Sequence, residues 1–91
     1  MIFNEMMQLV SRDVNIPVAD ILGQSRFKEH VRARFLVAAI ARSHGMGPCA
    51  IGRRINRDHT TITNALSRFP KVANEATMIV YRRYAGVHTH G

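Results

Sequence analysis

The chain has 91 residues, 46% of them apolar, and its 13 Lys and Arg against 6 Asp and Glu give a formal net charge of +7 at pH 7. This length predicts one domain, and the apolar fraction excludes a disordered chain. The charge favours an anionic partner; nucleic acid is the commonest, although ribosome-like packing or an anionic membrane surface fits the same bias. The one cysteine, Cys49, excludes an intramolecular disulfide and a thiolate zinc site, and favours a reducing compartment.

No part of the sequence predicts a membrane segment. The stretch MIFNEMMQLV lacks a basic leader followed by a long apolar run, and no window reaches the roughly 18 apolar residues that a spanning helix needs. We therefore expect a protein that resides in the cytoplasm and makes no membrane contact.

Two helices are predicted before residue 24. An apolar stripe with helical spacing predicts the first, from about residue 2 to 14. The stripe consists of Phe3, Met6, Met7, Val10 and Val14. Pro17 fits a first helical turn and Gly23 fits a stop, so residues 17–22 are expected to form a short second helix.

The central part of the chain predicts one long helix and one short helix. Residues 27–44 contain no Gly or Pro, and FLVAAIA at 35–41 is apolar on all sides, as in a helix that is covered from several directions. Gly45 is expected to end this helix. Pro48 then fits the first position of a fourth helix that ends near Asn56.

A fifth helix is predicted after a tight turn, and it has two clearly different faces. Its core-facing side follows the helical i, i+3, i+4, i+7 spacing and consists of Ile62, Ala65, Leu66 and Phe69. The remaining side chains are short and polar, and they point away from the core or flank it: Thr60, Thr61, Thr63, Asn64, Ser67 and Arg68. An ordinary solvent-facing helix surface would carry more Lys and Glu.

Pro70 is expected to break the fifth helix and to begin a sixth, which ends before Gly86. The residues expected to face inward are Val72, Ala73, Ala76, Ile79, Val80 and Tyr84. No segment shows the alternation of a strand. The sequence therefore predicts an all-α compact bundle of about six helices, with one domain over residues 1–86 and a flexible tail over residues 87–91.

Residues 47–69 fit a helix-turn-helix: GPCAIGRRI, then NRD, then HTTITNALSRF. The major groove of DNA admits one α-helix, and short polar side chains at its N-terminal end let the backbone come close to the base edges. Asp58 can cap the helix or accept a hydrogen bond from a cytosine amino group, and His59 and Thr60 can contact acceptor edges or thymine methyl groups.

The run RDHTT, preceded by AIGRRI, resembles the signature of the C-terminal DNA-binding domain (domain IV) of the bacterial replication initiator DnaA. The segments PVADILG, SRFKEHVRARF and LVAAIAR resemble the same domain in the same order, so the likeness covers roughly residues 2–85. It implies the helix-turn-helix fold of that domain, which is Trp-repressor-like, and binding of double-stranded DNA at DnaA-box-like sites.

The resemblance also implies roles for individual residues. It implies that Asp58, His59 and Thr60 read bases in the major groove. It places Arg57 and Thr61 against neighbouring bases or the backbone, and Arg26 in the adjacent minor groove. Phosphate contacts fall to Lys28, Arg32 and Arg34. Further candidates for contact with the DNA backbone lie outward on the fourth and fifth helices: Arg53, Arg54, Asn64 and Arg68. Simple solvation is the alternative for the basic residues, with phosphate contact favoured, and capping is the alternative for Asp58, which can also fill both roles.

The sequence departs from the family in ways that bear on function. One glycine usual before RDHTT and a proline usual near Ala33 are missing, which leaves the preferred box open. The 91 residues contain no GxxxxGK[ST] phosphate loop. We therefore expect a free-standing DnaA-like protein at the nucleoid that modulates replication initiation or transcription without ATPase activity. The replication initiator or other replication proteins are candidate partners, and the oligomeric state is open.

Two other classes of function compete with this interpretation. An enzyme or metal site would need convergent acids and histidines, but His30, His44 and His59 fall on separate segments. The two histidines of the C-terminal tail, His88 and His90, lack a nearby third ligand. We therefore expect no catalytic residue, metal or cofactor. A helical protein-interaction module of a replication or regulatory complex is the stronger rival, and salt dependence separates it from a DNA binder.

Overall fold

The computed structural model describes residues 2–86, which form six α-helices and, within that range, no strand. The helices are α1 (Phe3–Val14), α2 (Val18–Leu22), α3 (Lys28–Ser43), α4 (Pro48–Ile55), α5 (His59–Val72) and α6 (Glu75–Tyr84). The all-α prediction is confirmed. The tail predicted over residues 87–91 lies outside the described residues. No helix of residues 2–86 has the length and apolar content to cross a bilayer.

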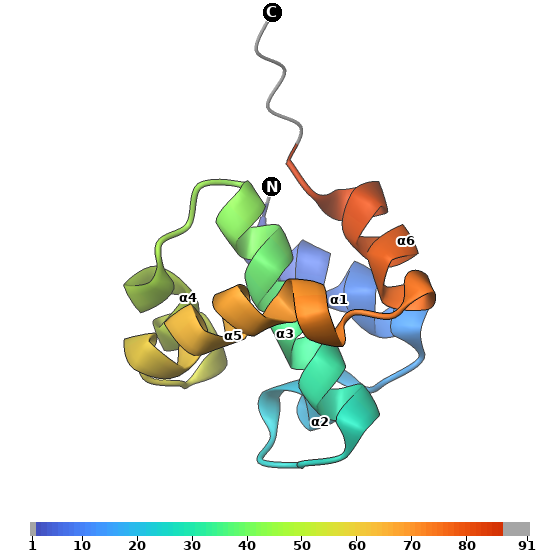
Figure 1. The fold of residues 1–91 in the computed structure, drawn as a ribbon, viewed down its shortest axis with the longest axis horizontal. Helices are drawn as coiled ribbons and strands as arrows, with labels where there is room; N and C mark the ends of the chain where they lie inside the picture. Colours follow the sequence, from blue (N-terminus) through green and yellow to red (C-terminus); the bar gives the residue numbers. More distant parts are fainter. Residues whose placement is uncertain (1, 87–91) are drawn as a thin grey trace, which may run out of the picture.

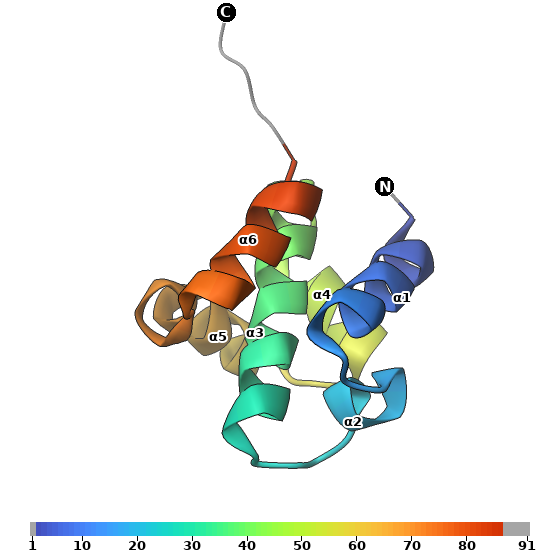
Figure 2. The ribbon, with the colours of Figure 1, turned by 90° about the vertical axis from the view of Figure 1, so that its right-hand side faces the viewer.

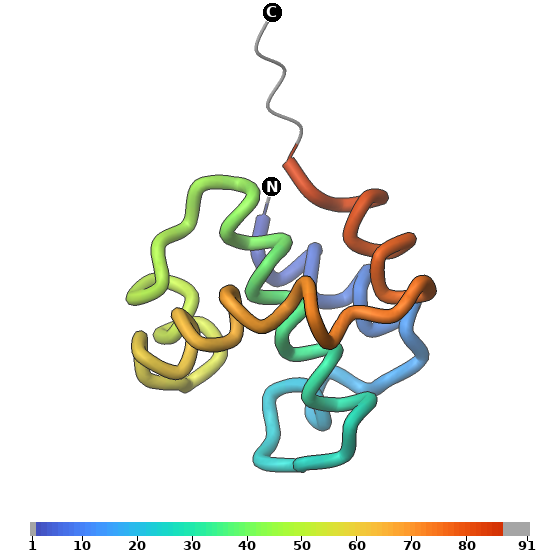
Figure 3. Tube along the Cα trace, viewed as in Figure 1, coloured from blue at the N-terminus to red at the C-terminus, as the bar shows by residue number. Residues whose placement is uncertain are grey.

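Helix α3 forms the centre of the bundle, and the other five helices all contact it (Figures 1 and 2). Its run from Leu36 to Ala41 is buried on every side, as the sequence predicted. Gly45 follows its end with a φ of 95°, a left-handed value that glycine adopts without strain. The trace in Figure 3 places α4 and the start of α5 on one side of α3 and α6 on the other.

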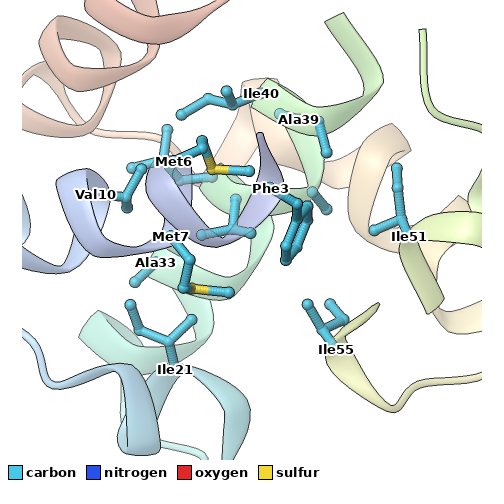
Figure 4. Close-up of a cluster of buried hydrophobic side chains, with 14 of the residues drawn as sticks. Phe3, Met6, Met7, Val10, Ile21, Ala33, Ala39, Ile40, Ile51 and Ile55 are labelled. Atoms are coloured by element: carbon cyan, nitrogen blue, oxygen red, sulfur yellow. The ribbon is translucent and has the colours of Figure 1, made fainter. Parts of the chain in front are cut away.

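The stripe of α1 supplies much of the core beside α3. Phe3, Met6, Met7 and Val10 are all buried, which confirms the predicted inward face. In Figure 4, Phe3 lies next to Ile51 and Ile55 of α4, so α1 supports the first helix of the helix-turn-helix directly.

The α2 segment differs slightly from the prediction. Pro17 precedes the helix in an extended conformation, and its carbonyl oxygen accepts from the backbone N–H groups of Asp20 and Ile21. Gly23 ends the helix as expected, although its φ of −76° is available to any residue. Glycine is required there for space, because a Cβ atom would lie 2.9 Å from the Ala19 carbonyl oxygen.

The prediction that Pro70 breaks the fifth helix is wrong, because α5 continues through Pro70 to Val72. Proline lacks an N–H and removes one helical hydrogen bond, but near a helix end little of the ladder depends on that bond. The buried side chain of Phe69 holds the last turn against the core, and its carbonyl oxygen accepts from Ala73 N–H at 2.9 Å.

Helix α6 therefore begins later than predicted and presents a different face. Asn74 is its N-cap, and Oδ1 of Asn74 accepts from the backbone N–H of Thr77 at 2.8 Å and from its hydroxyl at 2.7 Å. Val80 and Tyr84 pack inward as expected, but Ala76 and Ile79 are exposed and Thr77 is buried in their place. The error in the helix start shifted the predicted inward face.

Candidate nucleic-acid interface

A tight turn joins α4 to α5 and depends on a close backbone approach. Ile51 and Ile55 bury one side of α4, and Asn56 then takes the left-handed conformation (φ 56°, ψ 52°). The Arg57 N–H donates to the Gly52 carbonyl oxygen at 2.8 Å. A Cβ atom at Gly52 would overlap the Arg57 carbonyl oxygen, so only glycine fits where the turn returns to α4.

Asp58 caps the exposed start of α5. Its carboxylate accepts from the backbone N–H of Thr60 at 3.0 Å, and this bond is the main reason that the pKa of Asp58 lies below its usual value. The side chain stays 67% exposed, so the ionised carboxylate keeps accepting capacity toward solvent while it caps the helix. The cap prediction for Asp58 is confirmed.

The polar face of α5 is exposed as predicted. Ile62, Ala65 and Phe69 are buried and Leu66 packs against the core, whereas the short polar side chains of the opposite face are open to solvent. His59 is 62% exposed, with Nδ1 3.6 Å from Asp58 Oδ1. The Thr63 hydroxyl is turned back onto the helix, where it donates to the His59 carbonyl oxygen at 3.0 Å. The Thr60 side chain likewise bonds the Asp58 carboxylate, so two threonine side chains of this face are engaged locally although their residues stay exposed.

The structure does not place the Arg57 guanidinium with this exposed first turn. Its nitrogens donate to the carbonyl oxygens of Leu22 at 3.2 Å, of Ile55 at 2.9 Å and of Gly23. Arg57 thus connects the turn between α4 and α5 to the end of α2. The guanidinium N–H groups that base reading would need are engaged within the protein.

Arg34 and Arg32 are also engaged internally. The Arg34 guanidinium donates to the carbonyl oxygens of Ile21 at 2.7 Å, Ser25 at 3.2 Å and Asp20 at 3.2 Å. Burial, with a smaller effect of the Arg57 charge, lowers the pKa of Arg34. Nε of Arg32 donates to the Val72 carbonyl oxygen at 2.9 Å, which ties the start of α3 to the end of α5.

Residues 3–68 match the family described as the bacterial DnaA protein helix-turn-helix. The chain belongs to this family. The match spans α1 to most of α5 and includes α4, the turn and the start of α5. No curated protein and no solved structure matches the chain. The DnaA helix-turn-helix is a domain that binds double-stranded DNA and is not catalytic, so membership assigns DNA binding in general to this protein.

Several exposed cations of this DnaA-type domain lie on the helix-turn-helix and around the loop between α2 and α3, and others lie on α1, α3 and α6. Arg53, Arg68, Arg26 and Lys28 are all exposed. Arg54 is exposed too, but it stacks 4.8 Å from the Phe3 ring centroid and donates to Asn4 Oδ1 at 3.2 Å. Asn64 lies on the exposed face of α5.

Lys71 is a cation of this DnaA-type surface that the sequence prediction missed. It lies on the last turn of α5, and a shallow depression lined by Lys71, Arg26, Lys28 and Arg32 joins that turn to the basic loop. The sequence prediction ended the fifth helix at Pro70 and so separated Lys71 from it. Because α5 continues through Pro70, Lys71 lies on the same helix as the threonines. Within residues 2–86, no group of three or more His, Cys, Asp or Glu side chains is arranged to hold a metal ion.

Proposed function

We propose that this DnaA-type domain binds double-stranded DNA sequence-specifically at DnaA-box-like sites. The first turn of α5 enters the major groove, where Asp58, His59, Thr60 and Thr61 contact base edges. One observation carries the proposal: the capped start of α5 carries short polar side chains that are exposed to solvent. A helix tip of this kind can approach bases more closely than one that carries long side chains.

In this proposal the exposed cations contact the DNA backbone and set the register of the reading helix. The phosphate contacts come from Lys28, Arg53, Arg54 and Arg68, with Asn64 beside them, and Arg26 enters the adjacent minor groove. Arg57, Arg34 and Arg32 contribute differently, because Arg57 and Arg34 hold several backbone carbonyls within the protein and Arg32 holds one through Nε. We assign these three to holding the reading helix and the basic loop in a fixed relation.

We further propose that occupancy of such sites modulates replication initiation or transcription at the nucleoid. The support is the shared helix-turn-helix family: a domain that reads the initiator's kind of site can compete with the initiator there or bind beside it. The initiator and other replication proteins are therefore the first partners to test.

The test is replacement of His59 or Thr60 by Ala, with affinity measured by fluorescence anisotropy on a DnaA-box duplex and on a scrambled duplex. Each variant should lose about 1–3 kcal/mol of discrimination per lost base contact and should unfold at the parent's temperature, because both side chains are exposed. Gln8→Ala, an exposed polar change on α1, is the control and should bind as the parent does. Equal affinity of the parent for both duplexes, or binding insensitive to salt, would contradict the proposal.

A further inference from the structure

Phe27 is an exposed aromatic residue within the basic loop, and the proposed function does not use it. Its side chain is 70% exposed immediately before α3, between the exposed cations Arg26 and Lys28. A phenylalanine left in water forgoes the free energy that burial of its ring would provide. A ring in this position is therefore a candidate for burial against a partner.

The loop holds the Phe27 ring outward. The Phe27 backbone N–H donates to Ser25 Oγ at 3.2 Å, and the same hydroxyl lies 2.8 Å from His30 Nδ1. The His30 ring meets the Phe27 ring edge-on, with centroids 5.4 Å apart and planes at 79°. Behind the loop, Arg34 binds the Ser25 carbonyl oxygen. These contacts order the loop around the ring, which lowers the conformational entropy that the loop would lose on binding a partner.

The position of the loop relative to α5 identifies the partner. Arg57 bonds the carbonyl oxygens of Leu22 and Gly23, so the beginning of the loop is fixed beside the start of α5. Its far end, at Arg26 and Lys28, shares a depression with Lys71 on the last turn of α5, so the loop runs alongside that helix. With α5 in a major groove, a segment that runs alongside that helix meets the phosphate ridge and then the neighbouring minor groove. This step rests on the proposed function.

The chemistry of the loop matches that groove. Arg26 and Lys28 supply positive charge on either side of an apolar ring, and a minor groove has phosphates along both edges and apolar sugar and base surfaces inside. A hydrophobic protein surface would not favour two solvated cations beside the ring. The loop therefore fits DNA better than it fits an apolar protein face.

We propose that Phe27 is a wedge that enters the minor groove beside the major-groove site and partly unstacks one base step. Apolar side chains used in this way kink the duplex, and they favour pyrimidine–purine steps because these unstack most easily. Phe27 would then determine sequence preference at a step that α5 does not touch.

The experiment uses the full chain and a DnaA-box duplex that carries 2-aminopurine, a base whose fluorescence rises on unstacking, at successive flanking steps. The parent should raise the fluorescence at one step and bind most tightly when that step is TA. Phe27→Ala should abolish the rise and weaken binding roughly tenfold, while it retains the preference for box over scrambled DNA. Phe27→Leu keeps an apolar wedge and should retain most of the signal.

Ile79→Ala is the matched control, because it removes another exposed apolar side chain from α6, which lies away from the loop (Figure 2). It should leave fluorescence and affinity unchanged. Parent-like fluorescence and affinity in Phe27→Ala, with box preference intact, would overturn the wedge alone. If the parent itself failed to distinguish box from scrambled DNA, the proposed function would be overturned first.

Discussion

Arg57 connects the two parts of the proposed DNA-binding surface. Its guanidinium bonds the carbonyl oxygens of Leu22 and Gly23 at the base of the loop, and its backbone N–H closes the turn onto Gly52. Hydrogen bonds from a charged donor are stronger than neutral ones, and these half-buried carbonyls would lose their partners on truncation. Arg57 thus fixes where the loop stands relative to the start of α5.

Replacement of Arg57 by Ala should therefore destabilise the fold by about 1–3 kcal/mol, measured by chemical denaturation. It should also weaken binding to box and scrambled duplexes alike, since the loop and the helix lose their fixed relation. Arg53→Ala removes the same charge from an exposed position and should weaken binding without loss of stability. Parent-like stability of Arg57→Ala combined with a selective loss of box preference would instead make Arg57 a base reader.

The contacts and exposure of some side chains could be predicted from the sequence and those of others could not, for a physical reason. Asp58 was predicted as a cap and the α5 threonines as exposed, because both follow from spacing within one helix. The engagement of Arg57 could not be predicted, because its partners Leu22 and Gly23 lie 35 and 34 residues away in the chain. Arg34 was missed similarly, since its side-chain bonds return to the preceding helix and loop.

The packing of α4 against the turn depends on Gly52. A methyl group there would overlap the backbone oxygen of Arg57, which cannot move without displacing the first turn of α5. Gly52→Ala should therefore cost about 1–3 kcal/mol in the free energy of unfolding, and DNA affinity should fall with it.

Gly47→Ala is the matched control for Gly52→Ala, because a methyl group at Gly47 meets open space. Gly47 is the N-cap of α4, so its replacement should cost only about 0.5–1 kcal/mol. Equal stability of the two variants would contradict the close approach at Gly52.

Helices α1 and α6 are joined at their C-terminal ends by Asp13. Its largely buried carboxylate accepts from the Tyr84 hydroxyl, from Arg83 at 2.8 Å and from Arg12 Nε at 3.2 Å. The Tyr84 bond is the leading cause, with the two arginines, that lowers the pKa of Asp13 below its usual 3.8. The ionised carboxylate therefore stabilises the folded state above that pH, and the contribution disappears as pH falls through the lower pKa of the folded state.

Asp13→Asn should consequently lower the melting temperature at neutral pH and lose less further stability than the parent between about pH 5 and pH 2. Tyr84→Phe, which removes only the hydroxyl, should give an intermediate acid response. Thermal melts followed by circular dichroism across this pH range measure both. An acid-induced loss in Asp13→Asn as large as that of the parent would show that the α1–α6 junction does not depend on this carboxylate.

The error at Pro70 shows where element boundaries resist prediction. Proline argued for a helix break, but burial of Phe69 and the cap at Asn74 decided the boundary, and burial depends on packing that no local pattern displays. The correction has a functional consequence, because Lys71 joins α5 and the basic depression beside Arg26.

The whole domain is a bundle centred on α3 (Figure 1), and short polar residues and cations are exposed on its helix-turn-helix. The net charge of +7 provides attraction to any duplex, and its effect should fall steeply with salt. The helical class and the orientation of α5 were predictable from apolar spacing. The fixed relation of loop to reading helix was not, because it depends on arginine–carbonyl bonds between distant segments.

The central claim is that the first turn of α5 reads bases, and selection of bound duplexes from a random pool by the full chain tests it most directly. We expect one short motif to dominate after repeated rounds. Replacement of both His59 and Thr60 by Ala should remove that motif while general, salt-sensitive DNA binding continues. Retention of the pool without any enriched motif, or the same motif with the double variant, would contradict base reading by α5.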